Sequence, residues 1–213
     1  MILLGALRCI LAARAPVLAV YIAFHRDVGM RIAWLSIPIV GVAVTTLALG
    51  AIPVGKGNHA GEAAPEFTHQ AAEDWINSAP LSLESLRGQV VLIDFWTFDC
   101  RNCYRSFPWL NEVHARLARN GLQVIGVHSP EFLHEHEPVR VAAKVREFKL
   151  DHPVMIDNDF SYWKALGNQY WPAFYLVDKR GQLRYRFAGE THRGDSRARE
   201  IELRIGELLG EKP

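Results

Sequence analysis

The chain has 213 residues, 49% of them hydrophobic, and its 24 basic and 23 acidic residues leave a formal net charge of +1. This length allows one ordinary domain and an additional segment. The balanced charge and the lack of a basic stripe argue against nucleic acid as a partner.

Residues 32–55, IAWLSIPIVGVAVTTLALGAIPVG, carry no charge. As a helix rising about 1.5 Å per residue, this stretch covers the roughly 30 Å hydrocarbon core of a bilayer, so it predicts a transmembrane anchor. Arg26 and Arg31 precede it, and the positive-inside rule therefore places residues 1–31 in the cytoplasm. We expect an inner (cytoplasmic) membrane protein of a bacterium, spanning once, with everything after the anchor on the periplasmic, extracytoplasmic side.

The apolar and basic segment 1–31 leaves alternatives open. Translation from Met30 would omit residues 1–29, because MRIAWLSIPIV has the basic start and apolar run of an export signal. Cleavage after Gly50 would then remove the anchor. The apolar run is longer than the roughly 7 to 15 residues of a removable signal, which favours an uncleaved anchor.

Residues 56–73 are rich in Gly, Ala and Pro without periodicity, which predicts a flexible linker. Residues 74–211 have the pattern of a packed α/β domain. Its first strand is the apolar run VVLIDFW at 90–96. Apolar residues at helical spacing follow as far as residue 117, and Gly121 suits a left-handed helix end.

The remaining elements predict a mixed sheet. Strands are expected at 122–128 and 152–157 with a helix between them, an alternation typical of parallel pairing. The runs AFYLVD and LRYRFAG flank KRG at 179–181, which indicates an antiparallel hairpin, and a last helix follows it. We therefore expect helices on both faces of the sheet.

Cys100 and Cys103 are the only cysteine pair in the exported part, since the third cysteine, Cys9, lies in the N-terminal segment. A disulfide closing so small a loop removes little entropy from the unfolded chain, so a stapling role is unfavourable. Cys100 falls where strand meets helix, and the N–H groups of the first helical turn stabilise a thiolate there. Cys103 lies one turn along on the same side. The pair predicts redox exchange.

Two alternatives to redox exchange remain at this point. The two residues can be unconnected helix cysteines. They can also form half of a metal site completed by His134 and His136 of the HEHEP tract, which would make the protein a metal carrier. Such a charged tract is more often a solvated loop.

The segment VVLIDFWTFDCRNC resembles the active-site strand and helix of the thioredoxin-like fold. LQVIGVHSPEF followed by NQYWPAFYLVD is similar to the TlpA-like branch, specifically the thioredoxin-like domain of DipZ-type membrane proteins. The resemblance covers about residues 74–209. It implies a thiol-disulfide oxidoreductase that acts on protein disulfides without a cofactor, more in keeping with reduction than oxidation. A peroxide-reducing enzyme of the related redoxin type is a further alternative.

The resemblance also implies residue roles. Cys100 would be the attacking thiol and Cys103 the resolving one, with Asp94 as a buried acid that moves protons for Cys103. Pro172 would be a cis proline facing the dithiol, and the backbone of Trp171 would bind substrate.

Trp96, Phe98 and Glu131 are further candidates near the site. Trp96 and Phe98 either shield the dithiol, with Trp96 also a substrate-contact candidate, or belong to the core. Glu131, in the shared SPEF segment, is a second substrate-contact candidate. DipZ-type proteins carry a multi-helix electron-conducting membrane domain that this sequence does not contain, so we expect a separate membrane partner to supply electrons.

Overall fold

The structure is a computed structural model that describes residues 61–213. The predicted anchor at 32–55 and the segment before it lie outside the described residues. Within 61–213, none of the helices has both the length and the apolar character needed to cross a membrane.

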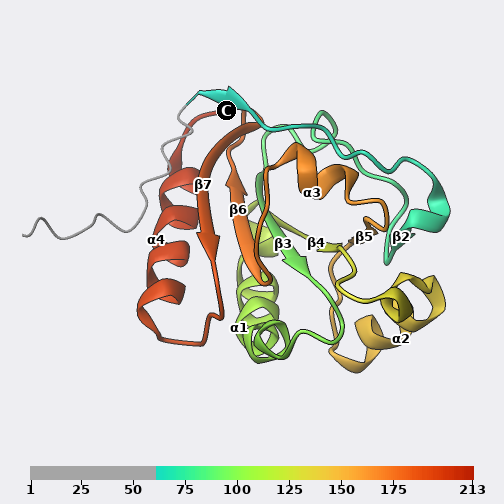
Figure 1. Cartoon of the computed structure of the whole chain (residues 1–213). Coiled ribbons are helices and arrows are strands. Elements are labelled where there is room, and N and C mark those ends of the chain that lie inside the picture. Colours follow the sequence, from blue (N-terminus) through green and yellow to red (C-terminus); the bar gives the residue numbers. More distant parts are fainter. Residues whose placement is uncertain (1–60) are drawn as a thin grey trace, which may run out of the picture. The chain divides into compact units, whose positions relative to one another are not determined.

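The described residues form one mixed seven-stranded sheet in the order β1-β7-β6-β3-β4-β5-β2 (Figure 1). The elements in chain order are β1 (Glu62–Ala63), η1 (Ala72–Asp74), β2 (Trp75–Ile76), β3 (Val90–Trp96), α1 (Arg101–Leu117), η2 (Ala118–Asn120), β4 (Leu122–His128), η3 (Leu133–His136), α2 (Pro138–Glu147), β5 (Val154–Ile156), α3 (Ser161–Ala165), β6 (Ala173–Val177), β7 (Gln182–Ala188) and α4 (Ser196–Gly210). Strands β3, β4 and β5 are parallel, and β6 runs antiparallel to β3 and β7. The predicted mixed sheet and hairpin are confirmed.

Strand β3 is buried along its whole length because both faces of the sheet are covered. On one face, apolar side chains of α1, α2 and α4 pack against Val90, Leu92 and Trp96. On the other face, α3 and the segment 67–86 pack against Val91, Ile93 and Phe95. Successive side chains of β3 point to opposite faces of the sheet, and because both faces are covered, all of them are buried.

The expected linker boundary at residue 73 is wrong. Strand β1 pairs with β7, and the Phe67 side chain is 2% exposed in the cluster that covers the second face of the sheet. The Gly- and Ala-rich composition of this stretch gave no indication that Phe67 is buried. Its ring packs edge-to-face on Trp75. Residues 61–73 therefore belong to the packed domain.

Helix α1 begins where the buried strand β3 ends. Its buried residues recur at helical spacing, and the chain leaves it through η2 to Gly121, whose φ of +96° is left-handed as predicted. Buried β3 on one side and the apolar face of α1 on the other fix the position of the short connection, residues 97–100. The two redox-candidate cysteines lie at this junction.

Candidate active site

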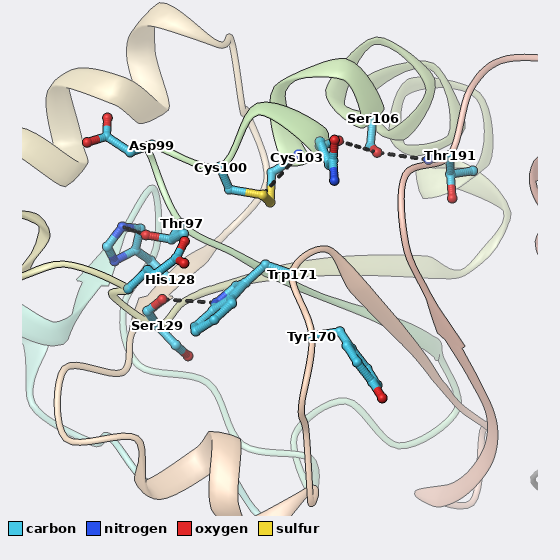
Figure 2. The surroundings of a disulfide bond; sticks show 12 residues. Thr97, Asp99, Cys100, Cys103, Ser106, His128, Ser129, Tyr170, Trp171 and Thr191 are labelled. Atoms are coloured by element: carbon cyan, nitrogen blue, oxygen red, sulfur yellow. Dashed lines mark hydrogen bonds between the residues drawn. A yellow bond between two sulfur atoms is a disulfide. The ribbon is translucent and has the colours of Figure 1, made fainter.

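Cys100 is the N-cap residue of α1 and is joined to Cys103 in a disulfide (Figure 2). The Cys100 Sγ accepts a hydrogen bond from the Cys103 N–H at 3.2 Å, so the cap role that a polar side chain usually fills is taken by sulfur. Unpaired N–H groups and the positive end of the helix dipole favour a thiolate at this position. The two cysteines are thus brought together as predicted.

The two sulfur-bearing residues differ in exposure. Cys100 is partly exposed, whereas Cys103 is 0% exposed within the apolar cluster below α1. An incoming disulfide can therefore reach Cys100 but not Cys103.

The loop before β6 lies at the edge of the same cluster as the disulfide. The Trp171–Pro172 peptide bond is cis, as the resemblance implied, and Pro172 is buried. The Trp171 Nε1 donates to the Ser129 carbonyl at 3.1 Å, and its ring packs on Trp163 with centroids 4.3 Å apart. Figure 2 shows this indole on the side of the disulfide toward the end of β4. A loop held this firmly presents its backbone in one conformation.

Asp94 lies on β3 and is 1% exposed, with no hydrogen-bond partner for either carboxylate oxygen among the described residues. Its neighbours along the strand, Leu92 and Trp96, pack in the cluster that contains Cys103, so the carboxyl points to the face that α1 covers. Burial raises the pKa of Asp94 from 3.8 to about 8. This places a protonatable acid on the sheet face that α1 and Cys103 cover, with a pKa close to neutral pH.

Glu135, which the sequence analysis did not single out, is the other wholly buried carboxylate at the site. Its Oε1 accepts from the Asp99 N–H at 2.9 Å, and its Oε2 accepts from the N–H groups of Glu131 and Phe132 at 2.6 and 2.7 Å. Burial pushes the pKa of Glu135 upward, but hydrogen bonds from Thr97 and these backbone groups outweigh it, and the pKa lies below its ordinary value. One anion thereby joins the segment leading into Cys100 to the segment after β4.

Of the two side chains expected to contact a substrate, Trp96 differs from expectation, whereas Glu131 stays a prediction. Trp96 is 0% exposed and packs against Phe107 and His128, so it belongs to the core and is not accessible to a substrate. The side chain of Glu131 is exposed, and its backbone N–H serves the Glu135 carboxylate. Glu135 was missed because it lies in the HEHEP tract, whose charges predict a solvated loop. Phe98 is buried and stacks on His128.

The residues proposed for the alternative metal site are not brought together. His134 is exposed and pairs with Asp99 at 2.5 Å. Within residues 61–213, the one cluster of His, Cys, Asp or Glu with metal-compatible spacing is His69, Asp157 and Asp159, which contains no cysteine. The buried Asp157 of that cluster already accepts from Ser129 and from the N–H groups of Tyr162 and Trp163.

Comparison with known proteins places this site in a family. The model of the AhpC/TSA family matches residues 60–186, more than half of the chain. The chain belongs to the AhpC/TSA family. Among its relatives, Protein DipZ of Mycobacterium bovis is 41% identical over 119 residues, which are 54% of this chain but only 17% of DipZ.

Two further members and neighbours match over most of their own length. The thiol-disulfide oxidoreductase YkuV of Bacillus subtilis is 30% identical over 147 residues, 69% of this chain and 94% of YkuV. A thiol-disulfide isomerase of Corynebacterium glutamicum has a solved structure that superposes with a TM-score of 0.60 at 27% identity, covering 70% of this chain and 98% of that one. The resemblance to TlpA- and DipZ-like members of this family, and the thioredoxin-like fold, are confirmed.

The buried Asp94 predicts that stability falls as pH rises. The folded protein holds the Asp94 proton up to about pH 8, whereas the unfolded chain loses it near pH 4, so folding becomes less favourable between these values. Replacing Asp94 by Asn removes this loss. Denaturant unfolding of oxidised Asp94→Asn should show it more stable than the parent by several kcal/mol at pH 8.5, with a much smaller difference at pH 4. The exposed Glu84→Gln serves as control and should show no such pH dependence.

Glu135→Gln and Glu131→Gln form a matched pair, four residues apart. Glu135→Gln puts amide donors where N–H groups now meet carboxylate oxygens, so we expect it to lower the free energy of unfolding by about 3 kcal/mol. Glu131→Gln changes an exposed side chain and should stay within about 0.5 kcal/mol of the parent. Urea unfolding at pH 7 measures both, and equal effects would contradict the assigned role of Glu135.

Proposed function

We propose that this protein is a membrane-anchored, extracytoplasmic thiol-disulfide oxidoreductase that reduces protein disulfides through Cys100 and Cys103. The observation that carries the proposal is the asymmetric pair at the start of α1, a partly exposed helix-capping sulfur and a wholly buried one. Relatives named thiol-disulfide oxidoreductases, YkuV and ResA, support the same chemistry.

The reaction follows from this asymmetry. The Cys100 thiolate attacks one sulfur of the substrate disulfide, forming a mixed disulfide and releasing the other substrate sulfur. Cys103 passes its proton to Asp94 and attacks the Cys100 sulfur, which frees the second substrate thiol. The substrate gains two electrons and two protons, and the dithiol becomes the Cys100–Cys103 disulfide. The backbone of Trp171, beside cis Pro172, is proposed to align the substrate chain.

A reducing direction is supported by the charges around Cys100. The exposed Asp99 precedes it, and the buried Glu135 is bonded to the Asp99 N–H. Both negative charges oppose the thiolate that the helix N-terminus favours. A dithiol whose thiolate is less stabilised gives up its electrons more readily, which lowers the reduction potential. Electrons would reach the dithiol from a separate membrane protein.

Trapping tests the exchange reaction. Reduced full-length protein should reduce insulin disulfides, Cys100→Ser should abolish this activity, and Cys103→Ser should accumulate a mixed disulfide with a substrate, because the resolving thiol is missing. Non-reducing gel electrophoresis and mass spectrometry identify the adduct. Sustained peroxide consumption with insulin left intact would instead establish the redoxin alternative.

Thiol labelling in intact cells tests anchoring and orientation. With a membrane-impermeant maleimide and reduced cells, a Cys9→Ser variant should be labelled at Cys100 and recovered in the membrane fraction. The matched control, Cys100→Ser combined with Cys103→Ser, retains only Cys9 and should stay unlabelled until the cells are permeabilised. Labelling of the first variant only after permeabilisation would contradict the proposed orientation.

A further inference from the structure

Around Asp94 and Gly126, several buried polar atoms have no hydrogen-bond partner among residues 61–213. They are the two carboxylate oxygens of Asp94, the Trp96 Nε1, both ring nitrogens of His152 and the Nδ1 of His114. Buried polar groups are nearly always paired with protein or water, so a group of such atoms in one region calls for a physical reason.

Gly126 on β4 brings these groups into one neighbourhood. It is the strand partner of Asp94, and a Cβ built on it would lie 3.1 Å from the Trp96 Nε1 and 3.3 Å from the His152 Nε2. The missing side chain lets both ring nitrogens lie over the β4 backbone at the position opposite Asp94. Neighbouring strands are about 4.8 Å apart, so the His152 Nε2 lies within about 8 Å of the Asp94 Cβ. Since the carboxylate extends beyond Cβ on the same face, a gap of this size fits one water that makes two hydrogen bonds of about 2.8 Å.

The opposite flank of Asp94 is apolar. Its partner on β6 is Phe174, which is 0% exposed and contacts Trp109 of α1 edge-to-face. An aromatic side chain therefore occupies the position beside Asp94 on the β6 side, whereas the unpartnered ring nitrogens of Trp96 and His152 lie over Gly126 on the β4 side.

His152 leads from this neighbourhood toward solvent. Its ring, 0% exposed, meets the ring of His114 edge-to-face with centroids 5.6 Å apart, and His114 is partly exposed on α1. Burial, then the neighbouring His114, lowers the pKa of His152 to about 3. Burial also lowers the pKa of His114 against the opposing charge of Asp151. Both rings are thus neutral at pH 7, and a neutral imidazole can accept a proton at one nitrogen while releasing one from the other.

We propose that His152 and His114 relay protons between Asp94 and solvent, with the Trp96 N–H orienting the water that joins Asp94 to His152. The proposal rests on the proposed dithiol chemistry. When Cys103 attacks the mixed disulfide, its proton passes to Asp94 in the ionised form, which a minority of the molecules carry at pH 7 because burial raises the pKa of this acid to about 8. Asp94 then returns to its ionised form by giving that proton through the water to His152, whose second nitrogen passes one on to His114 and solvent. No electrons move along this path, and the reverse reaction returns the proton by the same route.

Single-turnover resolution tests the relay. Full-length protein carrying Cys9→Ser is loaded at Cys100 with 2-nitro-5-thiobenzoate, and Cys103 attack is followed by release of the coloured thiolate at pH 7 in dilute buffer. We expect His114→Ala to slow release by about tenfold. This effect is smaller than the roughly 100-fold at the low end of the range for a positioned proton-transfer group. Added imidazole should restore the rate, because a soluble base replaces the missing surface relay. A residue with only a structural role would not produce this buffer dependence.

Three comparisons complete the test. His152→Gln should slow release without rescue by imidazole, since the lost group is buried. His192→Ala, which removes a partly exposed histidine paired with Glu190, should match the parent. The rate of alkylation of reduced Cys100 reports the attacking thiolate. This rate should be the same in the three histidine variants as in the parent protein.

Unaltered release from His114→Ala, independent of imidazole, would overturn the relay, and this holds even if His152→Gln does not fold. In that case, thiolate release and insulin reduction by the parent protein would still support the proposed function. Failure of the parent protein itself in both assays would refute the proposed function instead.

Discussion

The capping of α1 by a sulfur is the interaction on which the rest of the site depends. Strand β3 is buried on both faces, and only the four residues 97–100 separate its end from the start of α1. Cys100 at this point meets backbone N–H groups, and Cys103, one turn later, is placed among apolar side chains. The same geometry that makes one sulfur reachable makes the other inaccessible. In the proposed reaction, attack and resolution therefore fall to different residues.

Nearby charges have opposite effects on the thiolate of Cys100, the residue that caps α1. The helix N-terminus stabilises negative charge on Cys100, whereas Asp99 and Glu135 oppose it. Glu135 has a second effect, because its two oxygens hold the backbone before Cys100 and the backbone after β4 in one arrangement. A charge that would be costly to bury alone is satisfied by N–H groups, and it links the electrostatics of the cysteine to the conformation of its flanking loop.

Asp94 shows the complementary case, a buried acid with no such donors. Its proton stays bound near neutral pH because the core does not solvate the anion. The neighbours on its two sides differ, with Phe174 on β6 and the side-chain-free Gly126 on β4. The proposed proton exchange at Asp94 needs a polar connection to solvent, and the difference between its two flanks places such a connection on the β4 side.

The order of strands and helices, the mixed sheet and the junction that carries Cys100 and Cys103 were predictable from the sequence, because they follow from local periodicity and turn residues. Burial between distant segments was not. Phe67 packs in the core despite a linker-like composition, Glu135 is buried although its neighbours are charged, and His152 meets His114 across 37 intervening positions of the chain. Local patterns report the direction in which a side chain points, whereas its partners and its access to water depend on which segments the tertiary fold brings together.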